Sequence, residues 1–285
     1  MSAGQGTAAV AVAGIFGALR ILESRLAEQT FLILGAGSAG TGIADLLTKT
    51  MMQEGVPEAV ARARCWLFDS QGVVVSSRTG LAGFKKPYAH DHAPVPDFLG
   101  AVEAIQPTAI IGVSAIAGAF NQHVIQAMAR INERPIIFAY SNPTSHSECT
   151  AEEAYTCSQG RAIFASGSPF APVQYDGKTL VPGQGNNVYI FPAMGMAVYA
   201  TEAKRVTDEM FITAARAVAE QVTDANLETG LIYPPLSEIL PTSLHVSLRV
   251  AETIFDAGVA GIQRPVDLKG FIERMAYRPQ YRSLV

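Results

Sequence analysis

The chain has 285 residues, of which 49% are hydrophobic and 16% are charged, and its formal net charge is −4. This composition is typical of a folded protein with a large buried core, and it excludes an intrinsically disordered chain. The lysines and arginines form no basic stripe, so we expect no nucleic acid as a partner.

The first apolar stretch, residues 8–22, follows Thr7 and is interrupted by Gly14 and Gly17. It is short for a membrane span and no positive segment precedes it, so we expect neither a signal peptide nor a membrane partner. The pattern predicts a buried helix with Thr7 as its N-cap. The three cysteines include no Cys-x-x-Cys pair, which favours a reducing compartment: we expect the cytoplasm, although an organelle matrix also fits.

The next pattern is a run of four apolar residues that ends in a glycine ladder, Phe31-Leu-Ile-Leu-Gly-Ala-Gly-Ser-Ala-Gly. A helical pattern continues from it to residue 52. Strand, tight turn and helix N-terminus in this order are what the pyrophosphate of a dinucleotide needs. Gly35 permits the turn, Gly37 lets the backbone approach the phosphates, and Gly40 lets helix and strand pack closely. The alternative is a glycine-rich turn used only for packing.

Strand and helix patterns then alternate along the chain. Strands are predicted at 65–68, 73–75, 109–113, 135–139 and 162–165, and helices at 57–62, 98–105 and 121–132, with a further helix capped by Thr150 and Glu153. Near-continuous apolar strands predict an α/β fold with a Rossmann-like, doubly wound parallel sheet. After residue 186 the pattern becomes helical, at 190–201, 207–222, 236–256 and 267–276. We therefore predict a dinucleotide-binding domain over 1–186 and a mainly helical segment over 187–285.

Polar residues follow several of these strands, where ligands bind in doubly wound sheets. Asp69 is placed to accept hydrogen bonds from an adenosine ribose, although it could simply form a turn at the strand end. Ser70 and Lys85 could accommodate the 2′-phosphate of NADP, since a lysine beside a small hydroxyl suits a phosphate group. The alternative for Lys85 and Lys86 is solvated surface.

Asparagines mark two later loops. Asn142 follows a buried strand, and Asn186 and Asn187 follow two glycines in an unusually polar loop. Their side chains both donate and accept hydrogen bonds, so they suit carboxylate, carboxamide or hydroxyl groups of a ligand, whereas the alternative is a role in turns. His90 and His92 lie two residues apart on a loop, where we expect no metal site. We assign no catalytic residue and no metal ligand to this chain.

Eight segments carry a family resemblance, in a match that runs from about residue 5 to Tyr281: Gln5-Gly-Thr-Ala-Ala-Val, Leu34-Gly-Ala-Gly, Asn132-Glu-Arg-Pro, Ser141-Asn-Pro-Thr, Glu148-Cys-Thr-Ala-Glu-Glu-Ala-Tyr, Phe164-Ala-Ser-Gly-Ser-Pro-Phe, Pro182-Gly-Gln-Gly-Asn-Asn and Leu231-Ile-Tyr-Pro-Pro. As a set they resemble the malic enzyme family. Phe84-Lys-Lys-Pro and residues 277–283 are similar to its plant-type NADP-dependent members.

The resemblance implies oxidation of L-malate by NAD(P)+, decarboxylation at Mg²⁺ or Mn²⁺ and release of pyruvate. It also implies roles for individual residues. The pyrophosphate would be cradled by Gly35, Ala36, Gly37 and Ser38, with Gly40 in the same turn. At the adenosine end, Asp69 would meet the ribose, and Ser70 and Lys85 would bind the 2′-phosphate, which favours NADP over NAD. Toward the nicotinamide, Val113 and Ser114 would line the cofactor, Asn142 would contact nicotinamide ribose and substrate, and Asn186, with Asn187 beside it, would hold a malate carboxylate.

The chain also departs from the family pattern. Family chains are about twice as long, and an N-terminal region supplies their Tyr and Lys for acid–base chemistry, a substrate Arg and acidic metal ligands. Ser2 and Ala3 stand where an acidic pair is expected. The resemblance therefore implies an NAD(P)-binding domain that is inactive alone and needs the metal only in the complete enzyme. The alternatives are a non-catalytic dinucleotide-binding or interaction module, and a stand-alone dehydrogenase of another kind.

The same resemblance bears on assembly. In the family, the helices after about residue 187 pack partly against the region that is missing here. Phe191, Met194, Met196 and Val198 are therefore expected to be left uncovered. Exposed apolar patches promote association, so we expect a homo-oligomer.

Overall fold

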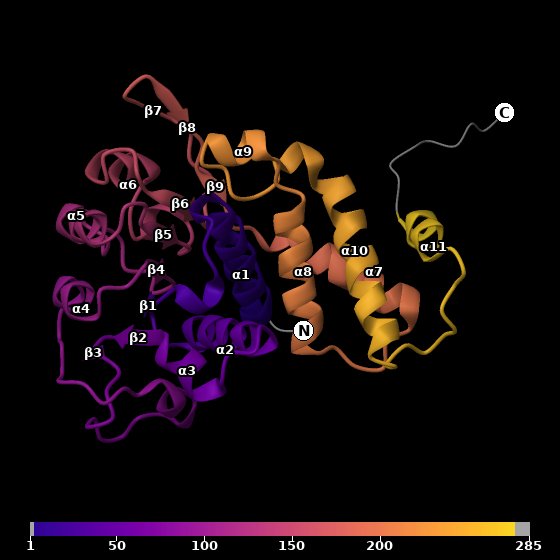
Figure 1. Cartoon of the computed structure of the whole chain (residues 1–285), viewed down its shortest axis with the longest axis horizontal. Helices are drawn as coiled ribbons and strands as arrows, with labels where there is room; N and C mark the ends of the chain where they lie inside the picture. The colour runs from indigo at the N-terminus through magenta and orange to yellow at the C-terminus, as the bar shows by residue number, and fades with distance from the viewer. Residues whose placement is uncertain (1–2, 277–285) are drawn as a thin grey trace.

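The computed structural model describes residues 3–276; Ser2, the tail 277–283 of the family resemblance and the end of the 187–285 segment lie outside this range. Its centre is a seven-stranded sheet in the order β3-β2-β1-β4-β5-β6-β9 (Figure 1). Neighbouring strands pair in parallel except β3, which runs antiparallel to β2. The strands are β1 Phe31–Leu34, β2 Cys65–Asp69, β3 Gly72–Val73, β4 Ala109–Gly112, β5 Ile136–Ala139, β6 Ile163–Ser166 and β9 Gly183–Gln184.

This architecture confirms the predicted α/β, Rossmann-like fold. Strands β1, β4, β5 and β6 are buried along their whole length, which is why their sequences are continuous apolar runs without alternation. Three short strands have no such signal and were not predicted. These are β9 and the hairpin of β7 (Val173–Tyr175) and β8 (Lys178–Leu180).

Helices cover both faces of the sheet (Figure 1). On one face, α4 (Phe98–Ile105), α5 (Gln122–Ile131) and α6 (Ala151–Cys157) bury apolar side chains against the strands. On the other face lie α1 (Ala3–Leu22), α2 (Ser38–Gln53) and α3 (Glu58–Ala63). The capping box of α6 is present as predicted, with Thr150 and Glu153 exchanging hydrogen bonds.

Helix α1 begins earlier than its sequence predicts. Thr7 lies inside the helix, so its predicted role as an N-cap is wrong. By length and composition Gly4–Leu22 could cross a membrane, but 72% of this window is buried inside the structure. Small residues such as Gly6 and Gly14 let other side chains come close to the helix axis. A Cβ on Gly6 would overlap the Phe191 ring, and one on Gly14 would overlap the Tyr233 hydroxyl.

The remaining helices extend the structure beyond α1 and α2. They are α7 Phe191–Thr201, α8 Asp208–Glu220, α9 Asp224–Glu228, α10 Ile239–Asp256 and α11 Leu268–Met275, with the 3₁₀ turns η1 Leu26–Glu28, η2 Gly83–Tyr88, η3 Thr144–His146, η4 Asn187–Tyr189 and η5 Leu236–Glu238. One apolar cluster runs from β1 and α1 through to α10. The predicted domain boundary at 186/187 thus crosses a continuous apolar core. The division of the chain into two domains at this position stays a prediction.

The prediction that α7 leaves its apolar side chains uncovered is wrong for Met194. Met194 has no exposed surface because α7 packs closely against α10. Phe191, Met196 and Val198 are half-buried, and Phe191 lies against Gly6 of α1. The exposed apolar side chain of this helix is instead Tyr199, at 76% of its full accessible surface. Helices within the chain therefore cover much of the surface that was expected to lie open.

Replacing Gly40 by alanine is expected to destabilise the fold. The added Cβ would lie 1.8 Å from the carbonyl oxygen of Gly35, so α2 must move away from β1. Overpacking of this kind costs about 2–3 kcal/mol in the free energy of unfolding, which urea titration measures. Gly195→Ala is the matched control, because a Cβ there meets nothing within 4 Å and the site is helical. Equal stability of the two variants would contradict the close contact.

Candidate functional site

The turn between β1 and α2 requires glycine for two separate reasons. Gly35 has a φ of +114°, which L side chains rarely adopt, and a Cβ there would lie 2.8 Å from the Val113 carbonyl oxygen. Its amide donates to the Phe68 carbonyl oxygen at 2.8 Å. The turn is therefore held between the ends of β2 and β4. That is the point where the strand order of the sheet reverses and where dinucleotides bind.

Helix α2 presents an open N-terminus at this point. It begins at Ser38, and its N-cap Gly37 supplies no side-chain acceptor for the first amide groups. Gly37 and Ser38 are exposed, and a Cβ on Gly37 would meet nothing within 4 Å, while Ala36 is buried beneath the turn. Free amides and the helix dipole favour an anion here. The geometry of Gly35–Ser38 therefore fits a pyrophosphate.

Asp69 ends β2 beside this turn and is held by two cations. Lys85 Nζ lies 2.6 Å from Asp69 Oδ2, and the Arg78 guanidinium lies 3.0 Å from the same oxygen. The amide of Gln71 donates to the other carboxylate oxygen at 3.0 Å. Asp69, Arg78 and Lys85 expose only 12%, 15% and 20% of their side chains, so this cluster is partly shielded from water.

The cluster is positive overall, with one carboxylate against two cations. Burial alone would raise the pKa of Asp69, but the hydrogen bonds from Arg78 and Lys85 hold it below its ordinary value. Asp69 is therefore ionised at neutral pH. Ser70 is exposed next to it. The buried Nε of Arg78 has no hydrogen-bond partner among residues 3–276, which leaves a donor unused in the cluster.

Arg78 was not predicted from the sequence, although Lys85 was. The only signal was a basic residue after two serines, Ser76-Ser77-Arg78, in a polar connection. Arg78 is nine residues from Asp69 along the chain, and the return of the 76–90 segment brings Arg78 and Lys85 to the same carboxylate. A lysine and a small hydroxyl residue near a strand end are enough to suggest a phosphate site from the sequence. The participation of Arg78 as a second cation depends on how this segment folds back.

The ends of β4 and β5 are joined by a buried carboxylate. Glu148 has no exposed surface; its oxygens accept hydrogen bonds from the Ser141 hydroxyl at 2.5 Å, the Ser141 amide at 3.3 Å and the Ser114 amide at 3.2 Å. A Cβ on Gly112 would overlap the Glu148 carboxyl group, so this position also needs glycine. Glu148 thus ties the predicted cofactor loop at Val113 and Ser114 to the loop that carries Asn142. It too was not predicted.

The three predicted asparagines line one pocket. Asn142, Asn186 and Asn187 surround a cavity of about 150 Å³ at the carboxyl ends of β5, β6 and β9, together with Thr7, Val10, Tyr140, Gly167 and Gly185. Ser168 donates to the side-chain oxygen of Asn142 at 2.7 Å. Asn186 accepts from the Val188 amide at 2.9 Å, so its NH₂ group is the part that can be offered to a ligand. The pocket is small and polar, suited to a carboxylate or hydroxyl.

The predicted site residues thus fall into four groups along one edge of the sheet: the glycine turn, the Asp69 cluster, the loop of Val113 and Ser114, and the asparagine pocket. Ser166, at the end of β6, is buried and donates to the Ser168 carbonyl oxygen at 2.8 Å. His90 stacks on Trp66, with ring centroids 3.6 Å apart. Within residues 3–276, no group of three His, Cys, Asp or Glu side chains could hold a metal ion.

Comparison with known proteins identifies relatives along nearly the whole chain. Residues 4–255 match the family described as the NAD binding domain of malic enzyme. The NADP-dependent malic enzyme of Vitis vinifera is 54% identical over 282 residues, which are 98% of this chain and 48% of that protein. The chloroplastic NADP-dependent malic enzyme of Zea mays is 50% identical, over 98% of this chain and 44% of that protein. The chain spans about half the length of the curated relatives it matches.

Solved structures show the same fold at lower sequence similarity. The malic enzyme of Entamoeba histolytica superposes with a TM-score of 0.76 at 23% identity, covering 95% of this chain and 52% of that one. The malic enzyme of Pyrococcus horikoshii gives a TM-score of 0.73 at 23% identity, covering 95% and 58%. At this identity the match establishes the fold alone.

Replacing Glu148 by alanine is expected to be strongly destabilising. It would leave the amides and hydroxyls of Ser114 and Ser141 without their acceptor in a dry environment, at a cost of about 3 kcal/mol or more in the free energy of unfolding. Urea unfolding measures this loss. Glu152→Ala is the matched control: this exposed acid near the start of α6 should change stability by about 0.5 kcal/mol or less. A Glu148 variant as stable as this control would show that the two loops do not depend on the carboxylate.

Proposed function

The chain belongs to the malic enzyme family, whose NAD(P)-binding domain it forms, and we propose that its cofactor is NADP rather than NAD. The observation that carries this choice is the pair of cations on Asp69. An aspartate alone at the end of β2 accepts hydrogen bonds from the ribose 2′-hydroxyl and repels a 2′-phosphate. Here Lys85 and Arg78 outnumber the carboxylate, so the local charge favours a phosphate dianion.

The geometry around this cluster supports the same choice. The exposed Ser70 hydroxyl lies next to Asp69 in sequence, and the Lys85 side chain keeps 20% of its surface exposed. Arginine and lysine together offer a phosphate both a planar fork and a point charge. The pyrophosphate would lie on the amides of Gly37 and Ser38, and the nicotinamide end would extend past Val113 and Ser114 toward the asparagine pocket.

We further propose that the complete protein oxidatively decarboxylates L-malate to pyruvate. NADP+ would accept a hydride from the malate carbon that bears the hydroxyl group. In this chain, Asn186 and Asn187 would hold a malate carboxylate, while Asn142 would orient both the substrate and the nicotinamide ribose. The cavity of about 150 Å³ that these asparagines line matches a small dicarboxylate in size and polarity.

A divalent metal takes no step in this proposal. The family resemblance implies Mg²⁺ or Mn²⁺, but residues 3–276 contain no cluster of three suitable ligands. Ser2 carries a hydroxyl group and Ala3 a methyl group, so neither provides the carboxylate expected at its position. The metal is therefore proposed only for the complete enzyme. What this chain contributes is cofactor binding and the polar lining of the substrate pocket.

The alternative is a module that binds a dinucleotide without taking part in catalysis. It would need the glycine turn and the Asp69 cluster, but it would have no use for three asparagines around a separate polar pocket. The presence of Asn142, Asn186 and Asn187 in one cavity therefore favours the enzyme domain.

Calorimetric titration of the chain with NADP and NAD in parallel tests the cofactor proposal. NADP is expected to bind more tightly, and Lys85→Ala should weaken NADP binding by about tenfold to a hundredfold while leaving NAD almost unchanged, because a charged hydrogen bond to the phosphate is lost. Asp69→Ala should weaken both cofactors. The matched control is Lys86→Ala, which removes the neighbouring exposed lysine that lies outside the cluster. Equal losses for NADP and NAD in the Lys85 variant would refute its role as selector.

We also propose that the chain self-associates through the outer surface of α7. Tyr199 is 76% exposed, and it borders an apolar groove of about 530 Å³ together with Val198, Phe271 and Met275. Light scattering is expected to show a dimer or larger assembly at high protein concentration, and Tyr199→Lys should shift it toward the monomer. A monomer at every concentration would contradict this proposal.

A further inference from the structure

Lys85, the proposed selector of the cofactor, lies on a segment, residues 76–90, in which few side chains are buried. Backbone hydrogen bonds tie its ends together, from the Ser76 amide to the His90 carbonyl oxygen and from the His90 amide to the Val74 carbonyl oxygen. Between them, every residue of 79–87 is exposed or half-buried. Besides its ion pair with Asp69, Lys85 therefore depends for its place on the nearest residue that anchors this stretch to the protein.

Tyr88 is the residue that does so. It is the last residue of η2 and is only 1% exposed, whereas Lys85, one 3₁₀ turn earlier, is half-buried. Residues three apart in a 3₁₀ helix lie on the same side, so the Tyr88 ring and the Lys85 side chain both face the body of the protein. Any displacement of Tyr88 would be passed through this single turn to Lys85.

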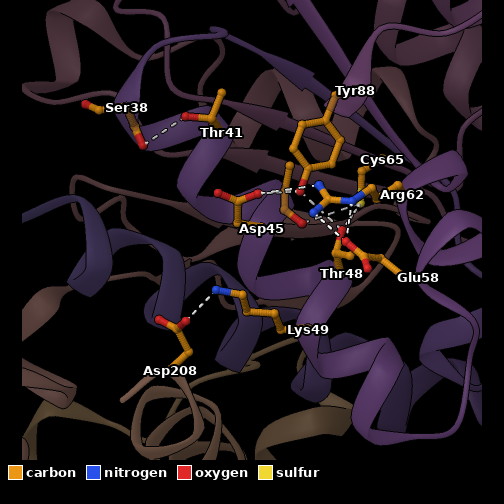
Figure 2. A network of polar contacts seen from close by, with 11 residues as sticks. Ser38, Thr41, Asp45, Thr48, Lys49, Glu58, Arg62, Cys65, Tyr88 and Asp208 are labelled. Carbon is orange, nitrogen blue, oxygen red and sulfur yellow. Dashed lines mark hydrogen bonds and ion pairs between the residues drawn. The ribbon is translucent and has the colours of Figure 1, made fainter. Parts of the chain in front are cut away.

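The Tyr88 hydroxyl ends in a polar network on α2 and α3 (Figure 2). It donates to Asp45 Oδ1 at 2.6 Å, and the Thr48 hydroxyl lies 3.3 Å away. The Arg62 guanidinium lies 5.3 Å from the centre of the ring and 3.9 Å from Asp45, and Glu58 holds it from the other side at 2.7 Å. Burial and the nearby Asp45 raise the pKa of Tyr88 well above its ordinary value, so the hydroxyl keeps its proton and acts as the donor.

This network connects the two ends of the proposed cofactor site. Asp45 lies on α2, whose N-terminus at Gly37 and Ser38 faces the pyrophosphate position, and Tyr88 lies on the segment that carries Lys85. The pyrophosphate and the 2′-phosphate of NADP are attached to the same ribose, so the covalent structure limits how far apart they can lie. A contact that joins α2 to η2 therefore sets how well the protein matches that distance.

We propose that Tyr88, bound to Asp45, is a positioning residue that sets the preference for NADP over NAD by fixing the place of Lys85. This inference rests on the proposed NADP site and on Lys85 as its selector. Tyr88 itself would not touch the cofactor. Its effect would be confined to the 2′-phosphate, since the glycine turn that holds the pyrophosphate depends on Gly35 and Gly40 instead.

Tyr88→Phe in the 285-residue chain tests the proposal, because it keeps the buried ring and removes only the hydroxyl. The dissociation constants of NADP and NAD are measured by calorimetry on the same preparation. The Kd of NADP is expected to rise about fivefold, because a displaced Lys85 makes a weaker hydrogen bond to the charged 2′-phosphate. The Kd of NAD, which has no 2′-phosphate, is expected to rise less than about twofold. General loosening of the fold would instead weaken both cofactors to the same extent.

Changes at the partner sharpen this test. Asp45→Ala removes the acceptor and should reproduce the loss of NADP preference, whereas Asp45→Asn retains a side-chain oxygen for the Tyr88 hydroxyl and should preserve the preference. Combining Tyr88→Phe with Asp45→Ala should add little further loss, as expected for two groups that act through one contact. The matched control is Tyr155→Phe, because Tyr155 is also buried and its hydroxyl has no hydrogen-bond partner in the part of the chain that the structure describes.

The outcomes separate this inference from the cofactor proposal. If Lys85→Ala abolishes the NADP preference while Tyr88→Phe leaves the ratio of the two constants unchanged, Lys85 is the selector and Tyr88 does not position it. If the unmodified chain shows no NADP preference, or Lys85→Ala weakens both cofactors equally, the NADP site itself is refuted, and the role of Tyr88 falls with it. A selective NADP loss in Tyr88→Phe and Asp45→Ala, absent in Tyr155→Phe, supports the proposal.

Discussion

The close contact between Gly40 and the Gly35 carbonyl oxygen is the constraint on which the rest of this structure depends. It sets α2 directly against β1, and it aims the N-terminus of α2 at the carboxyl edge of the sheet. Because β2 and β4 flank β1 in parallel, their ends come to the same edge. Asp69, at the end of β2, and the Ser114 loop, after β4, are therefore placed on either side of the turn by sheet pairing.

Charge is distributed unevenly along this edge. At the end of β2, two cations share one carboxylate and leave a partly shielded positive cluster. At the ends of β4 and β5, one fully buried carboxylate is surrounded by amide and hydroxyl donors. Both carboxylates are hydrogen-bonded within the protein, but only the first cluster carries the positive charge that attracts an anion. The difference separates Asp69, Arg78 and Lys85, for which we propose a role in cofactor binding, from Glu148, which joins two loops.

The asparagine pocket depends on residues from distant parts of the chain. Tyr140 forms one wall, and its hydroxyl lies 2.6 Å from that of Tyr233, which donates to the Val10 carbonyl oxygen of α1 at 2.7 Å. A hydrogen-bonded chain of buried groups thus connects the pocket to α1 and to the segment before α10. The helical part after residue 186 consequently supports the asparagine pocket as well as the apolar core, which continues across that position.

The local sequence determined the parts of this protein that follow from short-range patterns. Apolar runs placed the four central parallel strands, and the glycine spacing placed the turn at Gly35–Gly40, because backbone conformation and close packing act on neighbouring residues. The loop asparagines were also visible, since their polarity contrasts with the strands before them. Only the tertiary structure decided which charges meet: Arg78 and Lys85 reach Asp69, Glu148 reaches Ser114 and Ser141, and Tyr88 reaches Asp45. The contacts of Arg78, Lys85 and Tyr88 depend on how the polar 76–90 segment folds back, and those of Glu148 depend on how the loops after β4 and β5 meet. Periodicity along the chain carries no information about either path.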